Sequence, residues 1–459
     1  MRTVTKFLLL ALWLGLAGAA RAGTATNALV WEPGADRVSA DIRGEALWPL
    51  LEDIAHQTGW HIFVEPGANR KTDVKFAGLP SGEALKKLLG DLNFAYVPKT
   101  NEADQLYVFT TSLRNATQRV QAGTTNKPVA RKHAPNELLI KVKPGTDIEA
   151  LAKSLGAKVI GRDDKQGIYR LQFADAAATE TALGELKSNP DVTAVEYNNY
   201  LDPPTLAQKL EGTTGPGPVA LTLDTAASND PCHPVVGLID TPMQSLGSQL
   251  DPFILKPISV TGDTVVPGTA AGPTHATSMA QTILRAVSQQ SSSSAVKILP
   301  VDVYGNSETA TTWNVALGVK AAVDGGATVL NMSLGGTSDS TILSGILQQA
   351  MAKGVVVFAA AGNQPVATDT FPAALPGVIA VAATQGQQLA PYSNFGSFIS
   401  LALPGASVVY LGNQAYVVNG TSPATAYASG IAAGYKGINC DSWAQIQQMM
   451  QQKFPVPKN

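Results

Sequence analysis

The sequence predicts an α/β protein whose C-terminal half is a mostly parallel sheet flanked by helices. From residue 235 onward, short apolar runs typical of buried strands alternate with helical segments, which is the pattern of a parallel sheet covered on both faces. Before it, residues 136–202 follow the order βαββαβ, and residues 28–111 indicate a small mixed α+β unit. We therefore expect three folded domains along the chain.

Composition fits an ordinary globular chain. It has 459 residues, of which 45% are apolar and 15% charged, enough to bury more than one core. Its 33 basic and 35 acidic residues leave a formal charge of −2. Because no net positive charge attracts a polyanion, we expect no nucleic-acid partner.

Residues 1–22 have the three regions of a secretory signal peptide. Arg2 and Lys6 supply positive charge, residues 7–17 are apolar, and small residues surround Arg21. We predict removal of residues 1–22 on export to the periplasm or the extracellular space, with an uncleaved anchor as the alternative. No later stretch offers about 18 uncharged apolar residues, so no membrane span is expected.

Residues 28–111 combine strand and helix patterns. Strands are expected at 38–42, 60–64 and 106–109, and helices at 47–57 and from Ser81 onward. With Leu79-Pro-Ser-Gly-Glu-Ala-Leu85 after a strand, the unit resembles the short N-terminal domain of secretins and TonB-dependent receptors. That resemblance implies a protein-interaction domain with a protein partner.

Two histidines in this unit, His56 and His61, have a spacing that would suit a metal. One falls on the predicted helix and the other on a predicted strand, so we interpret them as surface or packing residues. The polar residues 112–135 that follow predict a flexible linker with basic sites open to proteolysis.

The βαββαβ segment at 136–202 has the order of a ferredoxin-like domain. Its opening Glu137-Leu-Leu-Ile-Lys-Val-Lys-Pro-Gly145 and closing Pro190-Asp-Val-Thr-Ala-Val-Glu196 resemble the inhibitory prodomain of subtilisin-like proteases. The resemblance implies a folding template and inhibitor, with residues 197–201 as a tail in the active-site cleft. An unrelated βαββαβ module is the alternative. Residues 203–229, rich in Pro and Gly, predict a second linker, in or just before which maturation is expected.

Four polar residues of the last domain stand at strand ends or helix starts, where active sites of parallel sheets are usually found. Asp240 ends the strand at 235–239, Asn363 follows the strand at 355–360, His275 opens a helical run, and Ser422 precedes a helix. Singly, each has a plain explanation as a cap or turn residue. Together they supply a nucleophile, a base, an orienting acid and an oxyanion donor, the set that acyl transfer requires.

At these residues the chain resembles the subtilisin-like serine protease family, with 136–202 as prodomain and 230–459 as peptidase domain. The order Asp, His, Ser and the intervals between the three match that family. The resemblance implies roles for Ser422 as nucleophile, His275 as general base, Asp240 as its orienting acid, and Asn363 with the Ser422 N–H as oxyanion hole. It also assigns substrate binding to Ser333, Leu334, Gly335 and Gly336.

The sequence departs from the family at several places. Thr241-Pro242 follows the aspartate where glycine is usual at the second place, Ser278 replaces a common glycine, and Pro423 replaces methionine or phenylalanine. Each leaves the catalytic atoms in place. Cys232 and Cys440 bracket the last domain, and the sequence leaves open whether they pair or stay as two buried thiols.

These features predict an exported serine endopeptidase that cuts proteins or peptides through an acyl-enzyme and is made as an autoprocessed zymogen restrained by its own prodomain. The chemistry requires no cofactor, and no residue is assigned as a metal ligand. The sequence leaves open whether the protein binds a structural calcium ion, and it does not allow ligands for one to be assigned. The alternatives are a catalytically weak or inactive protein-binding scaffold on the same fold, and an esterase using the same triad.

Overall fold

The computed structural model describes residues 28–32, 36–65, 68, 70–99, 103–116, 118–120, 132–210, 221, 223–225, 229–262, 266–268, 272–412 and 414–457. The predicted signal peptide, residues 1–22, lies outside them. The chain divides into two compact units, Met1–Lys127 and Pro128–Asn459. In the part of the chain that is described, no helix has the length and hydropathy needed to cross a bilayer.

The first unit packs two helices against two sheets, of order β1-β2-β4 and β5-β6-β3-β7. Helix α1 buries Leu47, Leu50, Leu51 and Ile54, the apolar positions whose spacing predicted it. Its elements are β1 (Ala28–Glu32), β2 (Arg37–Ala46), α1 (Leu47–Thr58), β3 (His61–Val64), β4 (Lys71–Leu79), α2 (Ser81–Leu89), β5 (Asn93–Val97), β6 (Gln105–Phe109), η2 (Leu113–Asn115) and β7 (Gln118–Val120).

The predicted flexible linker at 112–135 is partly ordered structure. Strand β7 pairs antiparallel with β3, and Val120 is buried in the core of the first unit. At the other end, β8 (His133–Val142) begins before residue 136, because Asn199 pairs with His133. Sequence composition missed both strands because backbone pairing, rather than apolar content, extends the sheets there.

The βαββαβ segment forms an antiparallel sheet of order β11-β8-β10-β9. Asp147 and Asp175 cap its two helices by accepting hydrogen bonds from backbone N–H groups in the first turn. Its elements after β8 are α3 (Ile148–Ser154), β9 (Lys158–Asp163), β10 (Ile168–Gln172), α4 (Ala176–Lys187) and β11 (Val192–Asn199). The observed order is the predicted one.

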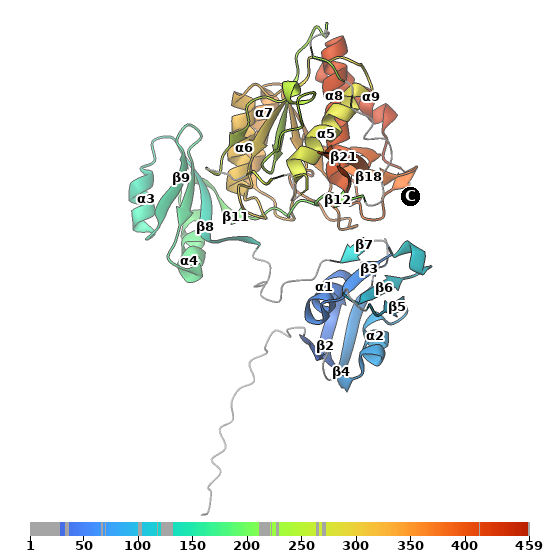
Figure 1. The fold of residues 1–459 in the computed structure, drawn as a ribbon. Coiled ribbons are helices and arrows are strands. Elements are labelled where there is room, and N and C mark those ends of the chain that lie inside the picture. Colours follow the sequence, from blue (N-terminus) through green and yellow to red (C-terminus); the bar gives the residue numbers. More distant parts are fainter. Residues whose placement is uncertain are drawn as a thin grey trace, which may run out of the picture. The chain divides into compact units, whose positions relative to one another are not determined.

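The last domain is built on a sheet of order β14-β15-β13-β16-β17-β18-β19, parallel except for β19, with β20 also paired to β18. Helices α5 and α8 pack into one apolar core, and α6 and α7 into the other, on opposite faces of the sheet (Figure 1). Its helices are α5 (His275–Ser288), α6 (Thr312–Asp324), α7 (Thr341–Ala352), α8 (Thr421–Asn439) and α9 (Trp443–Lys453).

The strands predicted at 235–239 and 355–360 are present, together with three further buried parallel strands of this sheet. They are β13 (Val235–Asp240), β15 (Lys297–Asp302), β16 (Val329–Met332), β17 (Val356–Ala360) and β18 (Ile379–Gln385). The sequence did not reveal the further strands β12 (Gln208–Lys209), β14 (Ile258–Ser259), β19 (Gln388–Leu389), β20 (Leu401–Pro404), β21 (Ala406–Leu411) and β22 (Gln414–Asn419). Strand β12 pairs with β22, so the predicted linker 203–229 also contains strand structure.

Helices α5 and α8 approach each other closely where Gly430 faces α5. A Cβ at Gly430 would lie 2.4 Å from the carbonyl oxygen of Ile283, closer than side chains tolerate. Ser278, which replaces a glycine common in the family, is fully buried and turns its hydroxyl back to the carbonyl of Thr274 at 3.1 Å. The serine is accommodated within its own helix and does not push the neighbouring helix away.

The βαββαβ domain docks on α6 and α7 through one face of its sheet. Leu139 and Ile168 form a buried cluster with Trp313 and Ile342 of those helices. At the edge of this contact, Lys320 forms an ion pair with Asp163 at 2.8 Å. The two domains therefore share an apolar interface within one compact unit.

Two side chains of β11 extend this contact to the N-termini of the same helices. Asn198 is fully buried and accepts a 3.0 Å hydrogen bond from the Trp313 N–H in the first turn of α6. Glu196 accepts from the hydroxyl of Ser340, the N-cap of α7, and from the Ile342 N–H at 3.4 Å. Both satisfy donors that a helix start leaves without an internal partner.

Cys232 and Cys440 form a disulfide across 208 residues of chain. The bond ties the segment before β13 to the residue that ends α8. The first of the two alternatives left open by the sequence is therefore the observed one. It covalently joins the element that carries Asp240 to the element that carries Ser422.

Candidate active site

Asp240 and His275 meet at the carboxyl edge of the parallel sheet. Asp240 is the last residue of β13, and His275 is the first residue of α5, whose N-cap Thr274 accepts a hydrogen bond from the Thr277 N–H. The imidazole Nδ1 lies 2.8 Å from both carboxylate oxygens. Each side chain is only 1% exposed. A carboxylate in this position fixes the proton on Nδ1 and leaves Nε2 as the basic nitrogen.

Thr241, which follows Asp240 directly, holds this pair in place. Its N–H donates to Asp240 Oδ1 at 2.7 Å, and its hydroxyl accepts from the Ala276 N–H at 3.0 Å. The residue therefore ties the end of β13 to the first turn of α5. This side-chain bond helps to fix the position of Asp240 relative to His275.

Ser422 is the second residue of α8, and Gly420 before it adopts φ +145°, which favours glycine. Its side chain lies at the positive end of the helix dipole, where developing negative charge is stabilised. The sequence suggested that Ser422 precedes the helix and that Pro423 is its first residue. In the structure, α8 begins at Thr421 and Pro423 is its third residue. Its missing N–H removes no hydrogen bond, because the first four donors of a helix have no internal acceptor.

The structure brings Ser422 to the same edge as the other two residues without a hydrogen bond to His275. Ser422 Oγ donates to the carbonyl of Ser333 at 3.2 Å, and Ser333 Oγ donates to the carbonyl of Ser422 at 3.1 Å. His275 Nε2 is buried and has no hydrogen-bond partner within the described residues. The Ser422 hydroxyl is thus engaged by the residue that follows β16.

Asn363 sits beside Ser422 with its amide oriented. Its Oδ1 accepts from the N–H and the hydroxyl of Thr421, at 2.8 and 3.0 Å. That bonding leaves Nδ2 as the donor on the other side of the amide, near Gly420. A fixed amide nitrogen next to a nucleophilic serine is suited to bind an oxyanion.

The predicted substrate segment, Ser333 to Gly336, follows β16 and lines the cleft. Gly336 exchanges two backbone hydrogen bonds with Phe371, at 2.9 and 2.8 Å, so one side of the segment is anchored. Its other side takes the chain that leaves the βαββαβ domain, since the Asp202 N–H donates to the Gly335 carbonyl at 2.8 Å. This is strand addition, the mode by which extended peptides bind sheet edges.

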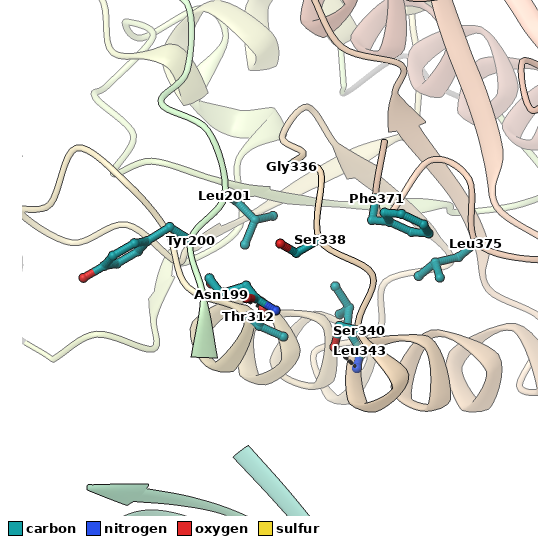
Figure 2. Close-up of a pocket in the computed structure, with 10 residues that line it drawn as sticks. All are labelled: Asn199, Tyr200, Leu201, Thr312, Gly336, Ser338, Ser340, Leu343, Phe371 and Leu375. Atoms are coloured by element: carbon teal, nitrogen blue, oxygen red, sulfur yellow. Dashed lines mark hydrogen bonds between the residues drawn. The ribbon is translucent and has the colours of Figure 1, made fainter. Parts of the chain in front are cut away.

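A pocket at this place is lined by both domains. Figure 2 shows Leu201 facing the segment of Gly336 and Ser338, with Phe371 and Leu375 beyond it. Leu201 is 6% exposed and belongs to the apolar core of the catalytic domain. The predicted tail, residues 197–201, thus ends inside the cleft with an apolar side chain as its anchor.

The sequence did not reveal Tyr304, which is 3% exposed and close enough to Asp240 to be affected by its charge. Burial, together with the nearby charges of Asp240 and Asp202, raises the pKa of the Tyr304 phenol above its ordinary value. The phenol therefore stays protonated, and it donates to the Asp202 carbonyl at 3.4 Å. Its position just after β15, which runs beside β13, was the signal available.

No group of three or more His, Cys, Asp or Glu side chains suited to a metal ion occurs among the residues that the structure describes. His56 on α1 and His61 on β3 are accordingly not part of such a group.

Comparisons with known proteins agree with this geometry. Residues 233–455 match the family model described as the subtilase family (Peptidase S8). Subtilisin Savinase from Lederbergia lenta is 33% identical over 187 residues, which are 39% of this chain and 69% of that protein. The chain belongs to the subtilase family. Its last domain is a subtilisin-like serine endopeptidase domain.

Two other relatives match different shares of this chain and of their own length. A thermostable alkaline protease from Halalkalibacterium halodurans is 29% identical over 324 residues, 67% of this chain and 82% of that protein. M-protease from Shouchella clausii is 33% identical over 187 residues, and the match spans 49% of that protein. The chain therefore spans about half the length of this last relative.

The subtilase has a recognisable prodomain as well. Residues 120–198 match the model described as the fervidolysin N-terminal prodomain. The crystal structure of fervidolysin from Fervidobacterium pennivorans, described as a keratinolytic enzyme related to subtilisin, has a TM-score of 0.57 at 18% identity. The match covers 70% of this chain and 57% of that one, and at this identity it supports the fold alone.

Proposed function

We propose that this subtilase is an exported endopeptidase that hydrolyses peptide bonds of proteins or peptides and is made as an autoprocessed zymogen. One observation carries the proposal: the buried Asp240–His275 pair and Ser422 stand at one sheet edge, beside a cleft that already holds an extended peptide segment. The export step rests on the sequence of residues 1–22 and places the enzyme in the periplasm or outside the cell.

The proposed reaction runs through side chains and backbone groups of this chain. Ser422 Oγ attacks the substrate carbonyl while His275 Nε2 takes its proton, and Asp240 stabilises the imidazolium that results. The Nδ2 of Asn363 and the N–H of Ser422 bind the oxyanion. His275 then protonates the leaving amine, and a water molecule hydrolyses the ester on Ser422. For this, the Ser422 hydroxyl turns from Ser333 toward His275.

Substrates bind as an added strand along the segment from Ser333 to Gly336. The chain's own residues 201 and 202 occupy that place, which supports an intramolecular prodomain that restrains the enzyme. Because Leu201 is buried in the apolar core of the catalytic domain, we expect preferred substrates to carry an apolar side chain at the equivalent position.

The first unit supplies a different function in this proposal. Its likeness in sequence to the short N-terminal domain of secretins and TonB-dependent receptors suggests a protein partner, bound independently of catalysis. Deletion of residues 28–120 is expected to leave hydrolysis of a short peptide unchanged while abolishing capture of that partner. A loss of peptide hydrolysis in a folded deletion variant would contradict the assignment.

Catalysis in this scheme requires no cofactor. The enzyme treated with EDTA is expected to keep its turnover number on a short peptide at low temperature. A lower unfolding temperature after EDTA, restored by Ca²⁺, would reveal a structural calcium ion. A loss of turnover in the folded enzyme would contradict the cofactor-free scheme.

The deciding experiment follows the chain mass of the precursor and of its Ser422→Ala form over time. Self-processing of the natural chain, labelling of Ser422 by a serine-directed phosphonate and an intact variant are expected. Identical behaviour of the two chains would instead favour the inactive protein-binding scaffold. Hydrolysis of esters without hydrolysis of peptides would favour the esterase, although a docked prodomain argues against it.

A further inference from the structure

The chain that joins the prodomain to the catalytic domain is held on both sides of Ser422. On one side, the Leu201 N–H donates to the Ala310 carbonyl at 3.0 Å, and the Asp202 N–H donates to the Gly335 carbonyl at 2.8 Å. Gly336 lies against Tyr200 and Leu201, so this stretch runs antiparallel to the segment from Ser333 to Gly336. The tail is therefore an extended segment held between two backbone segments, one at Ala310 and one at Gly335.

On the other side, the chain pairs with the strand that leads into the nucleophile. Gln208 and Lys209 of β12 lie opposite Val417 and Tyr416 of β22, in antiparallel register, and the Leu210 N–H donates to the Ala415 carbonyl at 3.0 Å. Strand β22 ends at Asn419, just before α8. Residues 203–207, which we call the crossing segment, bridge the two anchored stretches.

The two registers converge on the same residue. With Asp202 opposite Gly335, an antiparallel strand brings residue 204 opposite Ser333, whose carbonyl accepts from Ser422 Oγ. Counting back from Gln208 opposite Val417 brings Leu206 opposite Asn419, the last residue of β22, and an extended chain then carries Thr205 and Pro204 toward the start of α8. Both registers, extended through the crossing segment, therefore bring the carbonyl of Pro204 toward Ser422.

We infer that Pro204–Thr205 is the peptide bond cut during maturation, and that Pro204 slows the cut. The inference rests on the proposed function. Ser422 Oγ forms an ester with the Pro204 carbonyl carbon, the bond to the Thr205 nitrogen breaks, and the serine proton passes through His275 to that nitrogen. One water molecule then hydrolyses the ester, which leaves a carboxylate on Pro204 and returns the hydroxyl of Ser422.

The slowing of the cut by Pro204 follows from the chemistry of proline. In the antiparallel register, the N–H of residue 204 would donate to the Ser333 carbonyl, but proline has no N–H. That carbonyl instead accepts the Ser422 hydroxyl, which therefore is not hydrogen-bonded to His275. A residue with an N–H at position 204 would occupy this acceptor and free the hydroxyl to reach Nε2.

Pro203 provides a matched control. It is the same residue type in the same segment, but alternate residues of a strand direct their N–H groups to opposite sides. The N–H missing at 203 faces away from Ser333, toward the backbone segment that contains Ala310. Its substitution therefore changes the stiffness of the segment without supplying the donor.

The test follows processing of three full-length precursors: the natural chain, Pro204→Ala and Pro203→Ala. A second version of each precursor, which also carries Ser422→Ala, serves as the inactive control. The first new N-terminus is sequenced at early times, and the mature form is assayed on an unrelated peptide. We expect Thr205 as the first N-terminus, a two- to tenfold faster cut in Pro204→Ala, roughly the effect of one neutral hydrogen bond, and an unchanged rate in Pro203→Ala.

Each other outcome has a definite meaning. A first N-terminus elsewhere, or no cut in a precursor that hydrolyses peptides, overturns the assigned bond. If Pro204→Ala and the natural chain are cut at equal rates, or if both alanine variants are cut faster to the same extent, the slowing role of Pro204 is wrong. A chain that neither cuts itself nor hydrolyses peptides contradicts the proposed function rather than the cleavage position.

Discussion

The Nδ1 atom of His275 lies within 2.8 Å of both carboxylate oxygens of Asp240, with both side chains withdrawn from solvent. An imidazole held in this way has its proton on Nδ1 and its basic lone pair on Nε2. The finding makes the role of Asp240 testable without altering the nucleophile.

Asp240→Asn is expected to lower kcat by about 10⁴-fold, because an amide donor at this position favours the wrong imidazole tautomer. Mature enzyme concentration is set by titration with a phosphonate, and kcat and KM are measured on a short peptide. KM should change little, since Asp240 does not line the cleft. An equal loss in a folded Thr241→Ala variant would show that the effect is positional and not electronic.

Gly430→Ala is expected to destabilise the catalytic domain by about 1–3 kcal/mol through overpacking between α5 and α8. The new Cβ would meet Ile283 O at 2.4 Å and Ala286 Cβ at 2.7 Å. Gly345→Ala in α7 is the control, because no atom lies within 4 Å of its added Cβ. Urea unfolding in the Ser422→Ala background measures both, and the control should gain up to about 1 kcal/mol.

Replacement of Cys232 and Cys440 by serine is expected to lower the free energy of unfolding by about 2–5 kcal/mol, as for other structural disulfides. The bond closes a loop across 208 residues, so its removal frees many unfolded conformations. Dithiothreitol should lower the stability of the natural chain to that of the variant and leave the variant unchanged. Unchanged stability of the double variant would contradict the prediction.

The stability of the first unit is expected to fall as the pH drops from about 4.5 toward 2. Hydrogen bonds from Thr111 and Thr110 lower the pKa of the buried Glu65 carboxyl to about 2. Because the folded-state pKa lies below the ordinary value, the ionised carboxylate contributes stability above the ordinary pKa and loses it on protonation.

Glu65→Gln should remove most of this pH dependence and reduce stability at neutral pH, where the amide cannot accept all of these hydrogen bonds. Hydrogen exchange of the segment around β6 in full-length Ser422→Ala protein measures the effect. Glu83→Gln, on the exposed side of α2, is the control and should keep the natural pH profile. A profile of Glu65→Gln equal to that of the natural chain would refute the role of Glu65.

Local patterns were enough to predict much of this fold. The apolar runs at 235–239 and 355–360 predicted buried strands because a parallel sheet covered on both faces needs continuous apolar residues. Asp240, His275, Ser422 and Asn363 stand at strand ends or helix starts, and the topology of such sheets brings those positions to one edge. Their residue types and order could be read along the chain.

Pairings between distant segments could not be read in that way. Strand β12 lies in a stretch whose prolines and glycines indicated a linker, yet its backbone pairs with β22 in front of the nucleophile. Asn198 reached the N-terminus of α6 through the docking of two domains, a contact with no local sequence signal. Backbone hydrogen bonds carry no side-chain pattern, so only the assembled sheets reveal them.

The sequence by itself determined the class of fold, the order of the domains and the residue types of the candidate site, because these depend on local periodicity and on chemistry carried by single side chains. The tertiary structure alone decided the disulfide between Cys232 and Cys440, the bond between Ser422 and Ser333, and the pairing of β12 with β22. Those features depend on distances between residues far apart in the chain, which are set only when the sheets and helices pack together.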